Sequence, residues 1–263
     1  MSDYDPARRR LLTAGLVGAS SLAVSGCDAF DMLTDRDNPV RNFIEGANGL
    51  TYRAQRILLG RDALAKEFTR ADIRQPQRPN GVTNPPDEDY KALAANDFRG
   101  YRLEVRGMVS EKLSLSLDEL QAMPLRTQIT RHDCVEGWSC IAEWSGVPLS
   151  AVLERAEPAQ GARFVVFHCF DTIERGLSGN IRYYESIDMM DAYHPQTILA
   201  YGLNRETLPV SNGAPLRLRV ERQLGYKMAK YVRAIELVDR LTPFGLGKGG
   251  YWEDRGYDWY AGI

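Results

Sequence analysis

The residues best suited to metal or redox chemistry are a few cysteines and histidines. The 263-residue chain has four cysteines and three histidines, namely Cys27, Cys134, Cys140, Cys169, His132, His168 and His194. Cys134 is distinctive because polar and charged residues flank it, in Arg131-His-Asp-Cys-Val-Glu-Gly-Trp-Ser139. A thiolate at this position would act as a nucleophile, a metal ligand, half of a disulfide or a small buried apolar group. A soft thiolate suits a soft or high-valent metal.

The neighbours of Cys134 supply further candidate groups. Arg131 and His132 lie three and two positions before it, and His168 follows a strongly apolar run. We expect each of these to face the substrate or to orient the surroundings of a metal, with a packed polar residue as the alternative. The catalytic candidates are therefore Cys134, His132 and Arg131.

A second polar block lies about 75 residues further on, in Leu208-Pro-Val-Ser-Asn-Gly-Ala-Pro-Leu-Arg217 and Gly225-Tyr-Lys-Met-Ala-Lys230. An arginine fork suits a phosphate, because its N–H groups bind two oxygens at once. A tight turn such as Asn212-Gly213 can direct backbone N–H groups at an anion. The alternative is a hairpin turn with an arginine and a lysine on the surface.

Taken together, these blocks resemble a known family. Cys134-Val-Glu-Gly-Trp-Ser, followed by Glu143-Trp-Ser-Gly-Val-Pro-Leu149, is similar to the core of the oxidoreductase molybdopterin-binding domain of the sulfite oxidase superfamily. The second block is similar to the same domain. The resemblance covers about residues 101–237 and looks closest to the periplasmic methionine-sulfoxide reductase catalytic subunits.

The resemblance implies a role for each matching residue. Cys134 falls on the thiolate ligand of molybdenum, so it is also the predicted metal ligand. Asn212 and Arg217 fall on residues that hold the pterin and its phosphate. Met228, Ala229 and Lys230 fall on a segment that closes over the same phosphate. The implied cofactor is molybdenum on a molybdopterin.

Two positions depart from the family pattern. Where the reductase subunits have a threonine after a strand, this chain has Phe167-His168-Cys169, so Cys169 would line the cofactor through a weaker thiol contact. The family also has an N-terminal asparagine that contacts the pterin, and Asn80 is the candidate for that role. The chain ends before the additional dimerisation domain of the sulfite oxidases, which favours the reductase interpretation.

The elements that must position these residues are short. Alternating or continuous apolar patterns predict strands at residues 101–107, 113–116, 126–131, 163–170, 198–203, 216–220 and 232–238. Helices are predicted at residues 50–59, 117–123, 149–156 and 187–190, the second beginning at a capping box of Ser116 and Glu119. This mixture predicts an α+β fold with mixed sheets and short helices, as in the sulfite-oxidase-type domain. The sequence has no glycine-rich strand-to-helix turn of the kind that marks a nucleotide-binding Rossmann domain.

The N-terminus resembles an export signal. Arg8-Arg9-Arg10 precedes a weakly apolar run, residues 11–24, that is too short and too rich in Gly and Ser for the membrane anchor that is its alternative. The arginine pair favours the twin-arginine route to the periplasm, which carries folded proteins that often hold a cofactor. Val24-Ser-Gly-Cys27 resembles a lipobox, so Cys27 would anchor the protein to the inner membrane; the alternative is cleavage near Ala23-Val24-Ser25.

Three parts are therefore expected along the chain. Residues 1–26 form a leader cleaved before Cys27, residues 27–96 form an N-terminal segment that wraps the main body, and residues 97–263 form the molybdopterin-binding domain. The aromatic, glycine-rich tail from Gly245 to Ile263 is expected to pack back on that domain. The net charge of −2 and the lack of a basic stripe argue against a nucleic-acid partner.

The predicted function is oxygen-atom transfer at molybdenum, with reduction of a small-molecule sulfoxide or N-oxide preferred. One alternative is a sulfite-oxidising enzyme. Another, from a different class, is a non-catalytic exported zinc- or thiol-binding module built on His132, Cys134, Cys140 and Cys169, although no Cys-x-x-Cys knuckle is present. The resemblance implies a separate electron-transfer partner, either a membrane haem protein or a soluble cytochrome.

Overall fold

The computed structural model describes residues 49–50, 52–57, 60, 63–176 and 179–263. The chain divides into two compact units, Met1–Leu58 and Leu59–Ile263. In the first unit the described residues 49–50 and 52–57 are helical, as the sequence predicts. The arginine pair, the apolar run and Cys27 lie outside the described residues. Within the described part of the chain, no helix has the length and apolar character needed to cross a membrane.

The second unit contains all the named elements. In chain order they are η1 (Arg70–Asp72), α3 (Glu88–Ala94), β1 (Leu103–Gly107), β2 (Leu113–Leu115), α4 (Leu117–Gln121), β3 (Arg126–Cys134), β4 (Trp138–Pro148), α5 (Leu149–Ala156), β5 (Phe164–Gly176), β6 (Gly179–Asp188), α6 (Met189–Ala192), β7 (Ile198–Leu203), β8 (Glu206–Thr207), η2 (Val210–Asn212), β9 (Arg217–Arg219), η3 (Gly225–Lys227), β10 (Val232–Val238) and η4 (Glu253–Arg255). Many short strands and few short helices confirm the predicted α+β class.

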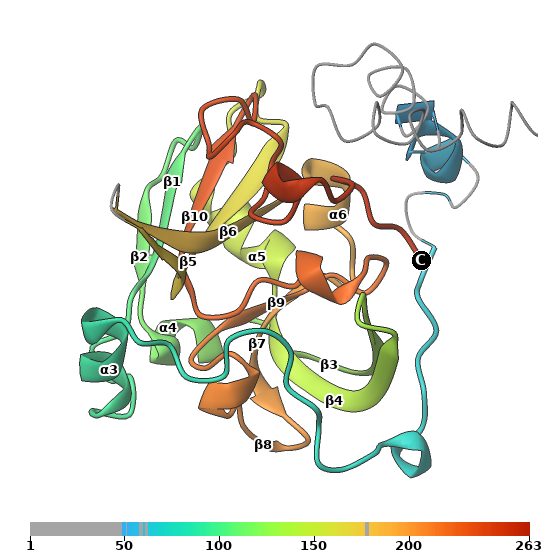
Figure 1. Cartoon of the computed structure of the whole chain (residues 1–263), viewed down its shortest axis with the longest axis vertical. Coiled ribbons are helices and arrows are strands. Elements are labelled where there is room, and N and C mark those ends of the chain that lie inside the picture. The colour runs from blue at the N-terminus through green and yellow to red at the C-terminus, as the bar shows by residue number, and fades with distance from the viewer. Residues whose placement is uncertain (1–48, 51, 58–59, 61–62, 177–178) are drawn as a thin grey trace, which may run out of the picture. The chain divides into compact units, whose positions relative to one another are not determined.

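Two five-stranded sheets form the unit (Figure 1). The first has the order β2-β1-β10-β5-β6, with β1 and β10 parallel and the other pairs antiparallel, so it is mixed as predicted. The second has the order β3-β4-β7-β8, with β9 paired to β7, and is antiparallel. The parallel pairing joins strands more than 120 residues apart, which local sequence patterns do not reveal.

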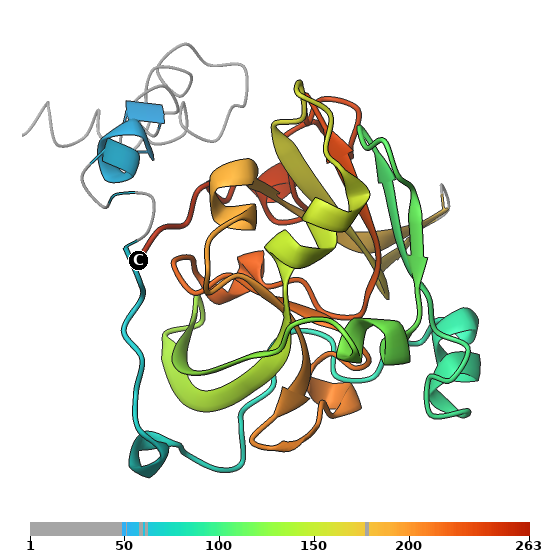
Figure 2. The ribbon, with the colours of Figure 1, turned by 180° about the vertical axis from the view of Figure 1, so that it is seen from behind.

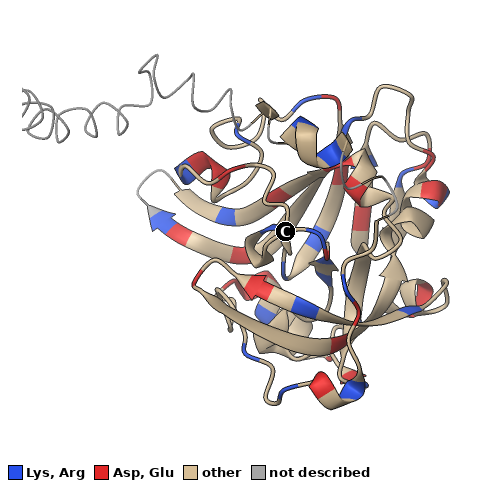
Figure 3. Ribbon diagram, turned by 90° about the vertical axis from the view of Figure 1, so that its right-hand side faces the viewer, with Lys and Arg blue, Asp and Glu red and all other residues tan. Residues whose placement is uncertain are grey.

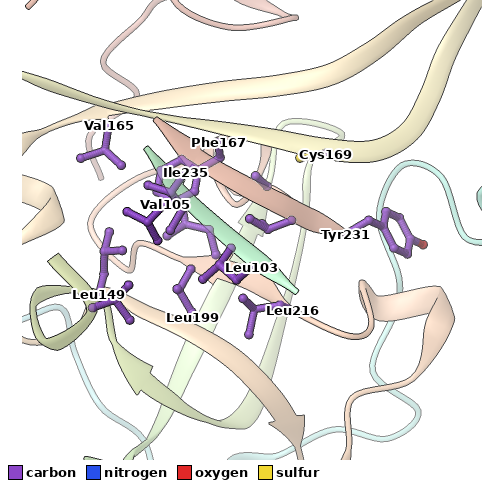
Figure 4. Packing of buried hydrophobic residues seen from close by; sticks show 14 of the residues in the cluster. Leu103, Val105, Leu149, Val165, Phe167, Cys169, Leu199, Leu216, Tyr231 and Ile235 are labelled. Carbon is purple, nitrogen blue, oxygen red and sulfur yellow. The ribbon is translucent and has the colours of Figure 1, made fainter. Parts of the chain in front are cut away.

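The main hydrophobic core lies on the inner face of the first sheet (Figure 4). Leu103 and Val105 of β1 point into it with Ile235 and Phe167, the partners in register on the next strands. Helix α5 lies between the two sheets in both ribbon views (Figure 2). It buries Leu149, Val152, Leu153 and Ala156, whose spacing places them on one helical face.

Local signals fix the ends of the helices. At α4, Ser116 Oγ accepts from Glu119 N at 3.1 Å and Glu119 Oε2 accepts from Ser116 N at 2.8 Å. This confirms the predicted capping box, which satisfies N–H groups that the helix itself cannot. Pro148 precedes the first turn of α5, where its missing N–H costs nothing.

Three strands, β4, β6 and the two-residue β8, were not predicted from the sequence. The segment after Cys134, predicted as a transition from strand to loop, is a tight turn into the long strand β4, and β6 was not predicted at all. Strand β4 has a run of buried residues on both of its faces, so it lacks the alternation that marks a half-exposed strand.

Lysine, arginine and acidic residues are interspersed over the ribbon (Figure 3).

The C-terminal tail packs back on the body, as its aromatic residues predict. Tyr251 N donates to Tyr184 O of β6 at 3.0 Å, and Trp259 Nε1 donates to Ser186 Oγ at 2.8 Å. Tyr226 of η3 donates through its hydroxyl to Asp258 O at 2.6 Å. The tail therefore covers β6 and reaches the short helix η3.

Candidate functional site

One face of the second sheet collects most of the predicted site residues. Side chains alternate along a strand, so Gln128, Thr130, His132 and Cys134 of β3 share a face. The first three are buried and Cys134 is half-buried. Polar groups are buried here where a strand would ordinarily carry apolar core residues. This face is therefore built for a purpose other than packing.

Cys134 lies at the end of β3, where the chain turns into β4. Gly137 adopts a φ of +82° and its N–H donates to Cys134 O at 3.0 Å, which closes the turn. Trp138 is the register partner of Cys134 across the hairpin. Partial burial raises the pKa of the Cys134 thiol, and the backbone N–H of Glu136 opposes this. A metal would have to stabilise the thiolate at this position.

His132 presents one ring nitrogen to the protein and leaves the other without a partner. Its Nδ1 lies 3.0 Å from Arg219 Nη1 and 3.3 Å from Met228 Sδ. Arginine only donates, so Nδ1 accepts and the neutral ring carries its proton on Nε2. Burial, followed by the charge of Arg219, holds the pKa of His132 well below its usual value. Nε2–H is buried without a partner among the described residues.

Glycine at position 225 allows the chain to pass directly over this ring. A Cβ there would lie 2.4 Å from His132 Cε1, so no side chain fits. Gly225 begins η3, and Met228 at its end provides the sulfur that contacts His132. The close approach fixes the imidazole plane from one side.

Two buried arginines of β9 lie over the ring of Trp144. The guanidinium carbons of Arg217 and Arg219 are 4.9 Å and 4.4 Å from the ring centroid. Arg219 pairs with both carboxylate oxygens of Glu221, at 2.9 Å and 2.6 Å. Arg217 instead makes one hydrogen bond, from Nη1 to Asn212 O at 2.8 Å. Its Nε and Nη2 are buried without partners in the described part of the chain.

The missing partner of Arg217 is reflected in its electrostatics. Burial, followed by the charge of Arg219, lowers the pKa of Arg217 to about 9. An arginine normally stays charged at any pH that proteins experience. The lowered pKa therefore marks a buried positive charge that makes no direct ion pair with an acid among the described residues.

Lys230 is the second buried cation without an ion pair among the described residues. Its Nζ donates to three backbone carbonyls, Asn80 O at 2.7 Å, Ser211 O at 2.8 Å and Val82 O. Burial, followed by the charge of Arg217, lowers the pKa of Lys230 to about 7. The amide Nδ2 of Asn212 is buried nearby with no partner among the described residues.

A turn at Gly213 brings these groups together. Gly213 has a φ of +115°, and a Cβ there would lie 3.0 Å from the side chain of Lys230 and 3.1 Å from that of Arg217. The chain can therefore pass between the two cations only as glycine. The resulting cluster of Asn212, Arg217 and Lys230 consists of donors and positive charges.

Such a donor set fits an anionic group such as a cofactor phosphate. Unpaired buried N–H groups cost about 1–3 kcal/mol each, so several of them in one place favour a ligand that supplies the acceptors. Here such N–H groups belong to Arg217, Asn212, His132 and Trp144. The first two would bind phosphate oxygens, and His132 lies on the strand that leads to Cys134.

The structure brings together most of the predicted site residues. The cofactor candidates Asn80, Asn212, Arg217, Met228, Ala229 and Lys230 all join this cluster or the backbone that supports it, with Leu218 N donating to Ala229 O at 2.7 Å. Asn80 contributes only its carbonyl among the contacts that the structure shows.

Two predicted residues lie elsewhere. Arg131 is exposed on the opposite face of β3 from His132 and Cys134, where its Nε pairs with Asp133 at 2.8 Å. Cys169 is buried in the core of the first sheet, opposite Val232 of β10, and burial raises its pKa well above the usual value. Arg131 was selected for its nearness in sequence, which ignores the two-residue period of a strand.

Sequence analysis missed Arg219, Trp144 and Gly225. The sequence did contain a signal for Arg219, because Arg217-Leu-Arg219 places two arginines on one face of a strand that is otherwise expected to be buried. Gly225 carried no such signal, because its need for close approach depends on a strand almost a hundred residues away.

The cysteines and histidines do not assemble a protein-only metal cluster in the described part of the chain. No group of three or more His, Cys, Asp or Glu side chains is placed there to hold a metal. Cys134, Cys140 and Cys169 are all free thiols.

Comparison with known proteins finds a matching family and several relatives. The family model described as "Oxidoreductase molybdopterin binding domain" matches residues 91–243. A "Putative protein-methionine-sulfoxide reductase subunit YedZ1" of Azospira oryzae is 36% identical over 257 residues, which cover 98% of this chain and 88% of that protein.

Other relatives carry related names. The "Protein-methionine-sulfoxide reductase catalytic subunit MsrP" of Burkholderia mallei is 31% identical over 90% of this chain and 70% of its own length. The protein of the same name from Xanthomonas campestris pv. campestris is 39% identical over 57% of this chain and 49% of its own length. The solved structure of the sulfane dehydrogenase SoxCD from Paracoccus pantotrophus is 24% identical, with a TM-score of 0.48, over 54% of this chain and 39% of that one.

Proposed function

The chain belongs to the oxidoreductase molybdopterin binding domain family, and we propose that it carries molybdenum on its molybdopterin and reduces a sulfoxide or an N-oxide there. The observation that supports this best is the set of orphaned N–H groups on Arg217, Asn212 and His132. His132 shares a face of β3 with Cys134, the proposed ligand of the metal, while Arg217 belongs to β9 of the same sheet and Asn212 to η2.

Each part of the site has a separate task in this proposal. Arg217 and Asn212 bind the phosphate end of the pterin, and Lys230 adds positive charge beside them. His132 donates through Nε2, with its ring held by Arg219, Met228 and the backbone of Gly225. When bound, molybdenum changes oxidation state and supplies the two electrons that reduction of a sulfoxide requires.

In this proposal Cys134 binds the molybdenum and so links the metal end of the cofactor to the protein. It lies at a hairpin end and is half-buried, so one side of the thiolate can bind metal while the other side faces the turn. Trp138 on the partner strand stacks with the guanidinium of Arg78, whose carbon lies 4.6 Å from the ring centroid. A cation and an aromatic ring therefore lie beside the proposed ligand.

The substrate class follows from the relatives and is the finer part of the proposal. The relative that covers most of this chain, and two further ones described above, are named as protein-methionine-sulfoxide reductase subunits. A sulfoxide is therefore the first substrate to test, and sulfite oxidation is the alternative. The partner we propose is a separate electron donor, either a membrane haem protein or a soluble cytochrome.

Export is also part of the proposal. The paired arginines Arg8 and Arg9 support delivery to the periplasm by the twin-arginine route, and Cys27 supports a lipid anchor. Replacing both arginines with lysine is expected to leave the protein in the cytoplasm with its leader uncleaved. Normal delivery of that variant to the periplasm would contradict the route.

The test of the function is a comparison of two cysteine variants. Purified protein from cells that make the cofactor is expected to hold about one molybdenum and one pterin per chain. With a reduced viologen as donor, it should turn over methionine sulfoxide faster than it oxidises sulfite. Cys134→Ser is expected to keep the pterin, lose nearly all turnover and change the molybdenum(V) spectrum.

Cys140→Ser is the matched control. Cys140 is opposite His132 on the neighbouring strand and buried, so it changes a thiol on the same face without touching the proposed ligand. Its spectrum should match that of the unmodified protein. If Cys134→Ser keeps full turnover and an unchanged spectrum, Cys134 is not the ligand. Zinc in place of molybdenum would overturn the function as a whole.

A further inference from the structure

A second positively charged cavity lies on the other sheet, away from the proposed cofactor residues. It has a volume of about 360 Å³, within the range of roughly 300–1,000 Å³ typical of small-molecule sites. Its lining includes Arg106, Arg182, Arg233, His168, Tyr184 and Phe244. None of its described lining residues is Asp or Glu. This composition favours an anionic occupant.

Strand register places the cavity on the outer face of the first sheet. Arg106 pairs in register with Glu236, Ala234 with His168, and His168 with Tyr184, so these side chains share one face. The adjacent residues Val105, Ile235 and Phe167 point the other way, into the hydrophobic core. The sheet therefore lies between this cavity and most of the core, and the core residues Cys169 and Tyr183 also line the cavity.

The C-terminal tail covers this cavity and is firmly held. Phe244 packs against His168, with ring centroids 5.9 Å apart. Gly245 has a φ of +53°, and the next residue, Leu246, donates its N–H to Asp254 Oδ2 at 2.9 Å. The same carboxylate accepts a hydrogen bond from the Tyr184 hydroxyl. Both the sheet and the tail are therefore in place before any ligand arrives.

The nearby acids are already engaged by the other cations. Glu236 accepts from Arg106 Nη2 at 3.0 Å and lies 2.9 Å from His168 Nε2. Asp89 accepts from Arg182 Nη2 at 2.9 Å, and Asp87 lies 3.4 Å from Arg182 Nε. Each of these carboxylates sits beside the cavity but does not line it.

Arg233 is the cation that remains unpaired. Its guanidinium makes no hydrogen bond or ion pair with any residue that the structure describes, and its carbon lies 5.9 Å from the centroid of the Phe170 ring. Burial, followed by the charge of Arg182, lowers its pKa. A half-buried guanidinium inside a cavity without an acid is arranged to bind a ligand's oxygens.

We propose that this cavity binds a small organic oxyanion, with a carboxylate or phosphate group held by Arg233 and an apolar body against Phe244 and Pro243. The arginine fork matches two oxygens of such a group. The residues on this face have no part in the proposed cofactor site, so the two sites can be tested independently.

The test uses the oxidised, cofactor-loaded protein, in which the cofactor phosphate occupies the site around Arg217. Phenyl phosphate and benzoate are titrated separately, so the two arms distinguish a phosphate from a carboxylate ligand. The chain has only three histidines, so their imidazole NMR signals report on separate places. Binding of at least one probe should shift the His168 signals and leave those of His132 and His194 in place.

Variants locate the binding site. Arg233→Gln is expected to weaken binding about tenfold, the effect of losing one charge-assisted hydrogen bond. Unchanged His132 and His194 signals in this variant will show that it is folded. Arg155→Gln, an exposed arginine on α5, makes the same change in net charge and should bind as the unmodified protein does.

Three outcomes would overturn the proposal. One is that neither probe shifts the His168 signals. Another is that Arg233→Gln binds as tightly as the unmodified protein. The third is that Arg155→Gln weakens binding as much as Arg233→Gln, because binding would then follow net charge instead of this cavity.

Discussion

Two groups of buried cations in the same unit differ in whether carboxylates pair with them. Lys227 Nζ lies 2.5 Å from Glu185 Oε1 and 2.5 Å from Glu253 Oε1, and all three side chains are at most 1% exposed. Arg217 and Lys230 are also buried, yet neither pairs with a carboxylate among the described residues. Burial alone therefore does not distinguish a structural cation from a binding one. The presence or absence of an acid partner does.

The paired group has a structural place in the fold. Glu185 belongs to β6, Lys227 to η3 and Glu253 to the tail, so one ammonium joins three separate segments. The same η3 holds Gly225 against His132. In the unpaired group, Arg217 keeps its Nε and Nη2 free for a ligand, whereas Lys230 adds positive charge while its N–H groups are held by backbone carbonyls. We expect the two groups to respond differently to the same type of substitution.

The largest expected effect is on stability when the paired lysine is removed. Lys227→Met leaves two carboxylates buried without their cation, which should lower the free energy of unfolding by about 3–5 kcal/mol. Arg217→Met is the matched change in the unpaired group. It removes an uncompensated charge and one hydrogen bond, so cofactor-free protein should unfold within about 1 kcal/mol of the unmodified protein. Urea unfolding of both variants measures the difference, and equal destabilisation would contradict the comparison.

The contrast between these groups also shows what the sequence could predict. Cys134, Asn212, Arg217 and Lys230 lie in local motifs, so a family resemblance identifies them without any knowledge of the fold. Arg219 and Gly225 depend on the pairing of distant strands, which no local pattern contains. The second cavity is less predictable still, because four strands and the tail contribute to it.

The strands divide in the same way. Strand β1 was predicted because Leu103 and Val105 alternate with exposed residues. Strand β4 was missed because its buried residues follow one another without alternation. Arg131 was placed at the site because it is near Cys134 in sequence. It lies on the opposite face of β3 because side chains alternate between the two faces of a strand.

A smaller effect should appear in anion binding by cofactor-free protein. Sulfate keeps its charge between pH 5 and 9, so it reports only on the protein's groups. Lys230, whose pKa burial lowers to about 7, is charged below that pH and neutral above it. Because sulfate favours the charged form, its affinity should be constant below pH 7 and fall by up to about tenfold per pH unit above it.

Two variants isolate the lysine in this experiment. Lys230→Met should bind sulfate more weakly and with a shallower fall in affinity above pH 7. Asp171, whose pKa burial raises to about 7, also ionises in this range and repels sulfate. Asp171→Asn should therefore still show a fall in sulfate affinity above pH 7, but a shallower one than the unmodified protein shows. Calorimetric titration at several pH values measures each affinity, and a slope in Lys230→Met as steep as that of the unmodified protein would show that the lysine is not responsible.

The smallest expected effect comes from the excess acid in the paired group. One lysine faces two glutamates, and burial, followed by the charge of Glu253, raises the pKa of Glu185 well above its ordinary value of 4.5. A raised pKa in the folded state contributes stability that is present below pH 4.5 and lost as the pH rises through the folded value. Glu253→Gln keeps the shape and a hydrogen-bonding oxygen for Lys227 but removes one negative charge. The pKa of Glu185 should then fall, so the loss of stability with rising pH should become shallower, with a change of less than about 1 kcal/mol at pH 7. Urea unfolding between pH 5 and 8 measures both slopes. A steeper loss in Glu253→Gln would mean that Lys227 needs both carboxylates charged, and that the second acid is part of the compensation instead of an excess.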